Sequence, residues 1–351
     1  MTKLQVSHFI LSVYLVLLCT NCANPSKCDN DKCNEDYIPW SNLTQLSEME
    51  QSETFSMKVI VLTMNRPDSL MRLLRSINRT YFEYDTDKID VEIHVDKAHG
   101  WLYEDCVRIA KNFTLPKNRG TVTAKIAEQN HGLRAAWFDS WWPETDEEHA
   151  IIVEDDLELA PSWYSWLKRA WLSYRHRSDV AGITLSRQFL MFKKPERSDM
   201  EILNDHKPFL YKLVGTWAYS PHPARWREML TWFRSLDSET FDPYVPGLVT
   251  SDWLHIHTWQ GRRHMTWEQW HIYHSEHNGL FTMYINLPKW EVLASNWREA
   301  GVHSKTSFNK PDYQLAMGCP IQVDIYSINF NNNKLKMSFL VARISREAEK
   351  V

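Results

Sequence analysis

The chain has 351 residues, enough for one large domain or two smaller ones, with 40 Lys and Arg against 44 Asp and Glu. The formal net charge of −4 provides no basic excess to neutralise a nucleic-acid backbone, so no nucleic-acid partner is expected. Glycine occurs 10 times and tryptophan 17 times, and no Gly-x-Gly-x-x-Gly or P-loop string is present. Dinucleotide-dependent oxidoreductases and P-loop kinases are therefore disfavoured.

The N-terminus has the pattern of a targeting segment. Lys3 precedes an apolar run over 9–18, which small and polar residues follow at 20–23. The run is about half of the ~20 apolar residues that a membrane-spanning helix needs. We therefore expect 1–23 to be a signal peptide, with a short signal anchor as the alternative, and membrane attachment only if the segment is retained. Residues 24–55, rich in Asn, Asp, Glu and Ser, are expected to form a stem.

Glycosylation sequons and cysteines also indicate the secretory pathway. Asn-x-Thr sequons occur at Asn42, Asn78 and Asn112. The cysteines beyond the targeting segment are even in number and are expected to form two disulfides, by any of three connectivities: Cys28, Cys33, Cys106 and Cys319. The expected location is the Golgi lumen or the cell exterior.

The globular part is predicted to begin near residue 56 with a strand, a turn and a helix. The nearly continuous apolar run 58–64 predicts a strand covered on both faces. Residues 65–69 are typical of a turn and helix cap, and apolar residues at 70, 73, 74 and 77 predict one buried helix face. A second strand, 90–95, ends at Asp96.

A third predicted strand, 150–153, ends in three consecutive acidic residues, Glu154, Asp155 and Asp156. Helices are predicted on either side of it, over 133–141 and 163–174. Strands that alternate with helices predict an α/β fold with a mostly parallel central sheet, in which ligands bind at the carboxyl ends of the strands.

The position of the acidic residues suggests a cation. Adjacent carboxylates repel one another unless a positive charge lies between them, and oxygen ligands suit Mg²⁺ or Mn²⁺. A metal held by one or two carboxylates completes its shell with substrate phosphates. The alternative is an acidic turn that caps the helix beginning near Pro161.

The string I-I-V-E-D-D-L-E-L-A-P-S-W, residues 151–163, resembles the metal-binding segment of GT-A glycosyltransferases, above all the Golgi α-mannosyl-glycoprotein β-N-acetylglucosaminyltransferase family. Further segments resemble that family in the same order: V-I-V-L-T-M-N-R-P (59–67), H-V-D-K-A-H-G (94–100), N-H-G-L-R-A-A-W (130–137), L-V-G-T-W-A (213–218), V-T-S-D-W-L (249–254) and A-G-V-H-S (300–304). The resemblance implies a GT-A (nucleotide-diphospho-sugar transferase) domain over 56–310.

The resemblance implies roles for the residues of the donor site. Asp156 would be the metal ligand, with Glu158 as an alternative, and His303 would complete the metal site. Glu154 and Asp155 would lie near the ribose and the sugar.

Three further residues are expected near the nucleotide. The resemblance implies that Asp96 accepts hydrogen bonds from uracil and that Arg66 faces the base or the diphosphate. Arg134 is a candidate to neutralise the diphosphate, or else an ordinary exposed helix residue.

The acceptor side is expected to involve two later segments. Asp252 would be the general base of an inverting transfer, or else the cap of a helix over 253–259. Gly215 and Trp217 would form an acceptor loop, and Trp253 lies beside the base, where an indole ring is suited to contact a sugar.

The sequence thus predicts a transferase of the secretory pathway that uses Mn²⁺ or Mg²⁺. It would move a sugar, with N-acetylglucosamine as the expected one, from a UDP-sugar to a glycan or glycoprotein. A non-catalytic glycan-binding protein and a retaining transferase on the same fold are the alternatives. Alternating apolar residues in 321–325 and 335–341 predict a C-terminal β-hairpin within a β extension, 311–351.

Overall fold

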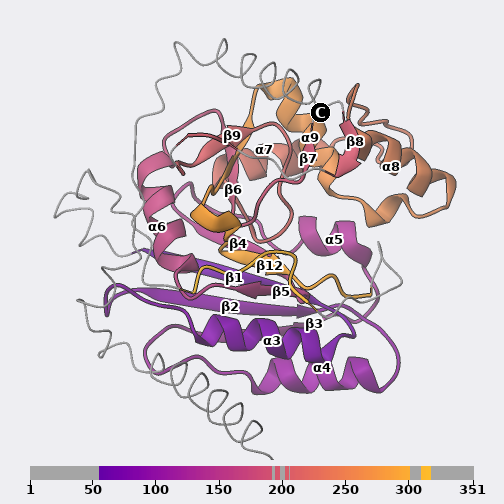
Figure 1. Ribbon diagram of the computed structural model, residues 1–351. Helices are drawn as coiled ribbons and strands as arrows, with labels where there is room; N and C mark the ends of the chain where they lie inside the picture. The colour runs from indigo at the N-terminus through magenta and orange to yellow at the C-terminus, as the bar shows by residue number, and fades with distance from the viewer. Residues whose placement is uncertain (1–54, 192–193, 198–201, 205, 301–309, 318–351) are drawn as a thin grey trace, which may run out of the picture.

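The computed structural model describes residues 55–191, 194–197, 202–204, 206–300 and 310–317 (Figure 1). Its central sheet has the strand order β3-β2-β1-β4-β10-β6-β11-β9. In that order the strands are β3 (Val122–Ile126), β2 (Lys88–Val95), β1 (Ser56–Thr63), β4 (His149–Glu154), β10 (Tyr219–Pro221), β6 (Val180–Thr184), β11 (Phe281–Tyr284) and β9 (Phe209–Tyr211). All but β10 and β9 run in the same direction.

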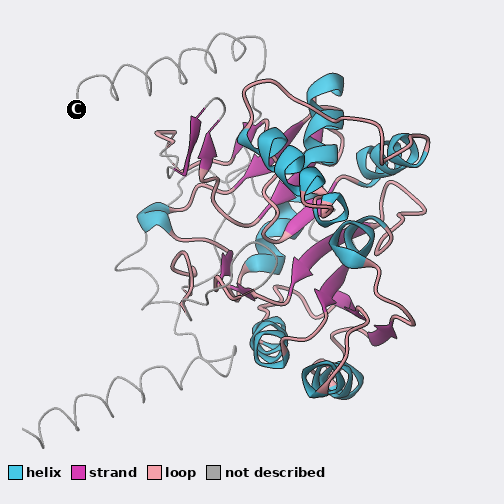
Figure 2. Cartoon of the chain, turned by 90° about the vertical axis from the view of Figure 1, so that its right-hand side faces the viewer, coloured by secondary structure: helices cyan, strands magenta, loops and turns pink. Residues whose placement is uncertain are grey.

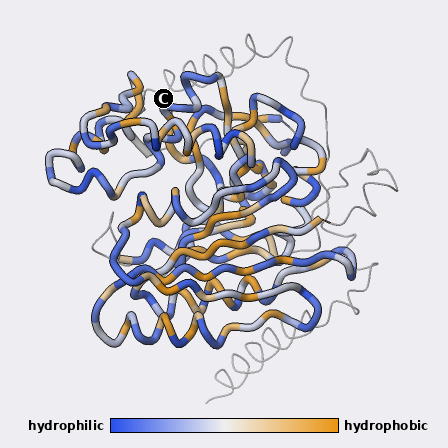
Figure 3. Tube along the Cα trace, turned by 180° about the vertical axis from the view of Figure 1, so that it is seen from behind, coloured by the Kyte–Doolittle hydropathy of each residue, from blue (hydrophilic) through white to orange (hydrophobic). Residues whose placement is uncertain are grey.

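The central strands are apolar because both of their faces are covered. Along β1, Met57, Val59 and Val61 enter one buried cluster, whereas Ile60 and Leu62 enter the cluster on the opposite face. Continuous apolar runs are typical of parallel strands that lie between helices. Figure 3 shows the hydrophobic residues concentrated along these strands.

Helices form a layer on each face of the sheet, as the side view shows (Figure 2). One buried cluster joins the sheet to α3 (Pro67–Asn78), α4 (Trp101–Asn112) and α6 (Trp163–Tyr174). The other cluster joins it to α5 (Gly132–Phe138), α7 (Pro223–Arg234) and α9 (Glu268–Asn278). On that second side, α8 (Val249–Trp259) leads into the 3₁₀ turn η4 (Arg263–Met265), which contacts both α5 and α8.

Smaller elements complete the described part. β5 (Leu157–Leu159) pairs antiparallel with β12 (Ala294–Asn296), and β7 (Leu190–Met191) pairs with β8 (Lys194–Arg197). A second 3₁₀ turn, η5 (Pro288–Trp290), lies between β11 and β12. The β5–β12 pair lies directly beyond the end of β4, since only Asp155 and Asp156 separate β4 from β5. The amide of Trp297, which follows β12, donates to the carbonyl of Asp156 at 2.9 Å.

The predicted α/β class, with a mostly parallel sheet flanked by helices, is confirmed. The targeting segment, the stem and both strands of the predicted C-terminal hairpin lie outside the described residues and remain predictions. Among the described residues, Cys106 is a free, buried thiol. The other three cysteines of the expected disulfides lie outside the described residues, so the disulfides stay a prediction. Within the described ranges, every helix is too short or too polar to span a membrane.

Candidate active site at the carboxyl edge of the sheet

Two strands with acidic ends, β2 and β4, meet on either side of β1 at one edge of the sheet. β1 pairs in parallel with both β2 and β4, so the residues that follow all three strands meet there. The amide of Asp96 donates to the carbonyl of Thr63 at 2.8 Å, and the amide of Asp155 donates to the carbonyl of Leu62 at 3.1 Å. The register thus places Asp96 and the acidic residues on opposite sides of the end of β1.

Asp155 is buried and fully engaged. It is 2% exposed, and its Oδ2 accepts a hydrogen bond from Thr63 Oγ1 at 2.6 Å, while Oδ1 is paired with Arg66. Burial raises the pKa of Asp155 to about 6, although the nearby Arg66 guanidinium favours the ionised form. Asp155 therefore anchors Arg66, which comes from the turn that precedes α3.

Glu154 is the most strongly perturbed of the three carboxyl groups. Its Oε1 accepts a hydrogen bond from the indole nitrogen of Trp137 on α5, at 3.1 Å. Burial, followed by repulsion from Asp156, raises the pKa of Glu154 to about 8. The raised pKa favours the protonated form of Glu154 near neutral pH.

Asp156 is partly accessible, unlike the buried Asp155. Its side chain is 15% exposed, and Arg66 Nη1 lies 3.3 Å from Oδ2. Among the described residues, no hydrogen bond reaches Asp156 Oδ1. Burial alone would lower the pKa of Arg66, but the carboxylates of residues 154–156 hold it above its ordinary value.

The alternative metal ligand, Glu158, is engaged elsewhere. Its two carboxylate oxygens accept hydrogen bonds from Arg79, at 2.7 Å, and from the indole of Trp297, at 3.0 Å. Arg79 caps the C-terminus of α3, whereas Arg66 precedes its N-terminus. Since a helix of 12 residues is about 18 Å long, Glu158 points away from the edge where Asp156 lies.

The Asp96 carboxylate holds the start of α5. It accepts hydrogen bonds from the amides of His131, at 2.9 Å, and Gly132, at 3.1 Å, and from the Asn130 side chain at 3.3 Å. The amide of Lys97 donates to it as well, at 2.8 Å. In this structure both oxygens of Asp96 are therefore occupied by protein donors, and the expected contact with uracil would have to share or replace them.

Arg134 points toward α7 and the segment that follows it. Its guanidinium lies 5.5 Å from the centre of the Phe233 ring and 5.7 Å from that of Trp270. Nη2 lies 3.4 Å from Ser238 Oγ and 3.5 Å from a Glu239 oxygen, while the buried Nη1 has no partner among the described residues. Desolvation lowers the pKa of Arg134.

The expected acceptor loop crosses the same edge of the sheet. β10 is antiparallel to β4 and β6, so its first residues lie beside the carboxyl ends of both strands. The carbonyl of Trp217 accepts a hydrogen bond from Thr184 Oγ1 at 3.1 Å. A Cβ on Gly215 would lie 2.7 Å from that hydroxyl oxygen, so a larger residue would push the loop off β6. The structure thus brings Gly215 and Trp217 to the edge that carries Glu154.

Asp252 and Trp253 lie exposed in the first turn of α8. The alternative in which Asp252 caps the helix is wrong, because α8 begins at Val249 and its N-cap is Leu248. The acidic-turn alternative for residues 154–156 is wrong as well. The N-cap of α6 is Ser162, the first turn of that helix contains no acidic residue, and β5 separates the turn from the helix. α8 begins four residues before the expected 253, which places Asp252 inside its first turn, whereas α6 begins at Trp163 as expected and the acidic residues lie too far before it to cap it.

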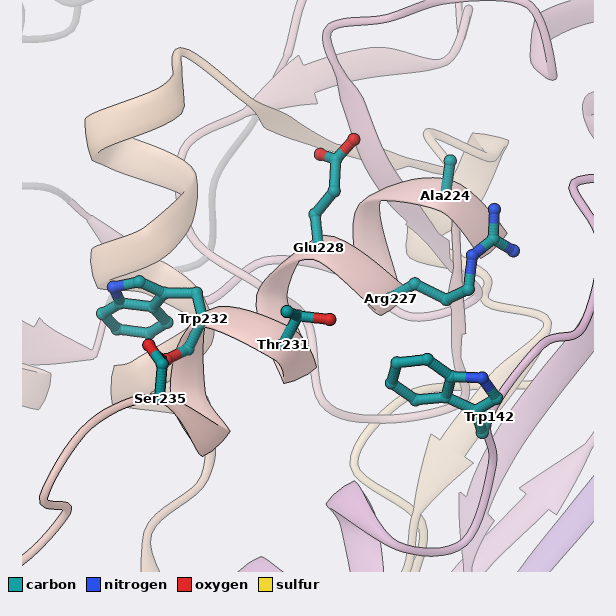
Figure 4. Close-up of a pocket in the computed structure, with 7 residues that line it drawn as sticks. All are labelled: Trp142, Ala224, Arg227, Glu228, Thr231, Trp232 and Ser235. Carbon is teal, nitrogen blue, oxygen red and sulfur yellow. Dashed lines mark hydrogen bonds between the residues drawn. The ribbon is translucent and has the colours of Figure 1, made fainter.

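Two features add nothing to this site. His303 lies outside the described residues, and within the described ranges no three His, Cys, Asp or Glu side chains group together as a ready-made metal cage. An open depression lies on the outer face of α7, between Trp142 and Trp232 (Figure 4), and none of the carboxylates of the candidate site lines it.

The residues that support the acidic edge were not predicted from the sequence. Thr63 had a usable signal, since a hydroxyl at the end of a buried strand often contacts the neighbouring strand end. The hydrogen bond from Trp137 to Glu154 had none, because α5 and β4 meet only through the fold. The role of the 130–132 segment in holding Asp96 depends on two backbone amides, which leave no mark in the sequence.

One family model is similar to part of the chain. A family model described as SPBC1E8.03c C-terminal domain matches residues 68–214, which is less than half of the chain. None of the curated proteins matches the chain.

Several solved structures are similar to parts of the chain. S. aureus TarS is 14% identical over 66% of this chain and 58% of its own, with a TM-score of 0.35, so the chain spans little more than half of that structure. GalNAc-T7, solved with UDP, GalNAc and Mn²⁺, is 11% identical over 67% of this chain and 43% of its own, with a TM-score of 0.40. Mannosyltransferase PcManGT from Pyrobaculum calidifontis, in complex with GDP-Man and Mn²⁺, is 13% identical over 50% of this chain and 46% of its own, with a TM-score of 0.33.

Proposed function

We propose that the chain is a metal-dependent GT-A glycosyltransferase that moves a sugar, with N-acetylglucosamine as the first candidate, from a UDP-sugar to a glycan or glycoprotein hydroxyl. The observation that carries this proposal is the acidic edge. Glu154, Asp155 and Asp156 are three adjacent carboxyl groups, and Arg66 is the cation that pairs with them among the described residues. Even with Glu154 protonated, the one guanidinium of Arg66 faces two carboxylates, Asp155 and Asp156, and a divalent cation on a diphosphate would balance the remaining negative charge.

The side chains at this edge fit such a cation. Asp155 is taken up by Thr63 and Arg66, but Asp156 keeps one carboxylate oxygen available. Mg²⁺ and Mn²⁺ suit oxygen ligands, and a shell of one or two carboxylates is completed by phosphate and water. Asp156 would therefore hold the cation, with His303 as the proposed second ligand. Once bound, the cation would stabilise the negative charge that develops on the leaving diphosphate.

The other residues of the edge would orient the donor. Arg66 is fixed by Asp155 and presents a planar set of donors that match phosphate oxygens. Glu154 and Asp155 would lie near the ribose and the sugar. Asp96 would contact the uracil, and Arg134 would approach the diphosphate only by leaving its present contacts.

The acceptor would enter from the side of β10 and α8. Asp252 is exposed, so it is available to take the proton of an acceptor hydroxyl as that oxygen attacks the anomeric carbon. Attack opposite the leaving diphosphate inverts the configuration of that carbon. Gly215, Trp217 and Trp253 would contact the acceptor.

The proposed location is the secretory pathway, either the Golgi lumen or the cell exterior. The apolar segment near the N-terminus and the three sequons support it. Asn78 and Asn112, the two sequon residues within the described part, are both exposed and are thus accessible for glycosylation.

The direct test is a transfer assay with UDP-sugars and Mn²⁺ that compares the wild type with Asp252→Asn. We expect turnover to fall by about 10² to 10⁴, as is typical of a lost general base, while UDP binding stays the same. Asp146→Asn is the matched control, because Asp146 pairs with Arg227 away from the edge.

Two outcomes would support the alternatives instead. Glycan binding without any transfer would favour a non-catalytic binding protein. A product with retained anomeric configuration, or near-normal turnover of Asp252→Asn, would favour a retaining transferase in which Asp252 has a structural role.

A further inference from the structure

Large apolar side chains are exposed in and beside α8 more than elsewhere in the described chain. Nine such residues are exposed, and four of them fall within 244–259. These are Tyr244 (42% exposed), Trp253 (39%), Ile256 (51%) and Trp259 (86%). A concentration of this kind on a soluble surface usually marks a binding site.

The geometry of the helix places two of them on the same face as Asp252. Asp252, Ile256 and Trp259 stand at positions i, i+4 and i+7, which lie on one side of an α-helix. The opposite side, which includes Ser251 and Leu254, is buried against the rest of the protein. The proposed base, Asp252, therefore lies at the N-terminal end of an exposed helix face that also carries Ile256 and Trp259, and we call this face the apolar stripe.

The polar groups around this stripe include the carboxylates of Asp242 and Asp252 and one half-exposed cation, Arg262, which follows the helix and donates to the side chain of Gln260. His255 stacks on Tyr244, with ring centres 5.5 Å apart, and hydrogen-bonds to Asp242 at 2.9 Å. No Lys or Arg occurs in α8. Arg263, which follows it, is buried and donates to the carbonyl of Ser238 at 2.8 Å.

This chemistry distinguishes between possible occupants. An anionic membrane surface or an anionic glycan would need a cluster of Lys or Arg beside the aromatic rings, whereas Arg262 is outnumbered there by Asp242 and Asp252, which would repel an anion. A neutral sugar has an apolar face that stacks on an indole ring and hydroxyl groups that hydrogen-bond to carboxylates and imidazoles.

The stripe also connects with the donor side of the molecule. α8 contacts η4, η4 contacts α5, and α5 carries the Trp137 indole that donates to Glu154. Figure 1 shows α5 and α8 on the same side of the molecule.

We propose that the outer face of α8 binds the acceptor, and that this acceptor is an uncharged glycan whose rings stack on Trp259 and Ile256. The inference rests on the proposed transferase function, because the role of Asp252 as the base determines which end of the stripe holds the reacting hydroxyl. It adds the substrate class, a neutral oligosaccharide, and two residues that determine specificity. The bound glycan would extend from Asp252 along the helix, so the enzyme would recognise sugar units beyond the one that is modified.

The test uses the full chain on an array of neutral and anionic glycans, in the presence of UDP and Mn²⁺. The variants are Trp259→Ala and Ile256→Ala, and Trp101→Ala is the matched control. Trp101 is 71% exposed at the start of α4, in the layer on the opposite face of the sheet. We expect the wild type and the control to bind neutral glycans, and both α8 variants to bind them about tenfold more weakly or not at all.

Other occupants would give different results. No binding of neutral glycans by the wild type, or undiminished binding by Trp259→Ala, would overturn the proposal. Two other results would also overturn it. One is wild-type binding to phosphatidylserine vesicles that Trp259→Ala abolishes, and the other is self-association of the wild type in sedimentation that the same substitution abolishes. A separate titration with UDP and Mn²⁺ shows whether the donor site works, so a failure of the transferase proposal is distinguishable from a failure of this one.

Discussion

His149 is a buried histidine whose two ring nitrogens have no hydrogen-bond partner among the described residues. It lies between Phe55 and Trp171, with ring centres 5.0 and 5.1 Å away and interplanar angles of 21° in both cases. Burial, assisted by the neighbouring His222 and Arg175, lowers its pKa to about 3. The site is thus built for a neutral ring.

This predicts an acid-dependent loss of stability that a single substitution reduces. The unfolded chain takes up a proton at His149 near its ordinary pKa, about 6.5, whereas the folded chain takes it up only at about 3. The contribution of His149 to folding stability is therefore lost as the pH falls from about 6.5 toward about 3. We expect His149→Phe to lose less thermal stability than the wild type over this range. Thermal unfolding of both proteins is measured by circular dichroism across this pH range. An equal loss of stability in the two proteins would show that His149 is not responsible.

Among elements, α6 is joined to the start of β2 by a buried ion pair. Lys168 Nζ lies 2.7 Å from Asp87 Oδ1, and the side chains are 4% and 1% exposed. The Lys168 ammonium also lies 5.0 Å from the centre of the Tyr84 ring. Since α6 packs on the same face of β1, β2 and β4 as α3 and α4, this pair helps to hold α6 against the strands that carry the acidic edge.

Removing one partner should cost far more stability than removing both. Lys168→Met leaves the buried Asp87 carboxylate without its cation, and we expect a loss of about 3–5 kcal/mol in the free energy of unfolding. Lys168→Met/Asp87→Leu should recover much of it. Arg225→Met, at an exposed pair with Glu228, is the control, with an expected change below about 1 kcal/mol. Urea unfolding measures all three, and a loss as small as that of the control would contradict this role.

The sequence predicted the elements that place the acidic edge, but not all of the sheet. Strands β1 and β4 are apolar runs covered on both faces, and β2 alternates buried apolar residues with half-buried polar ones, so their patterns and their polar ends were readable. β3 was missed although its five residues alternate, because the run is short and none of its side chains is fully buried. β10 was missed because three residues carry too little pattern, and its antiparallel direction depends on how the chain returns to the sheet. The role of Asp96 as an anchor for α5 also depends on tertiary contacts.

At the scale of the whole molecule, the two layers of helices leave one edge of the sheet for chemistry. The layer with α3, α4 and α6 supports the strands from one side, and Arg66 enters the edge from the turn before α3. The layer with α5 and α7 to α9 supplies Trp137 on the donor side and Asp252 on the acceptor side. The fold thus separates the group that is proposed to hold the leaving diphosphate from the group that is proposed to activate the acceptor.

The central claim is that Asp156 joins the protein to a nucleotide diphosphate through a divalent cation. Calorimetric titration of UDP into the wild type and Asp156→Ala, with Mn²⁺ or with EDTA, tests it most directly. We expect the wild type to bind UDP with Mn²⁺ and to lose that affinity in EDTA, and Asp156→Ala to show no gain from Mn²⁺. UDP binding by the wild type that is the same with and without Mn²⁺, or by Asp156→Ala with unchanged affinity in Mn²⁺, would contradict the claim.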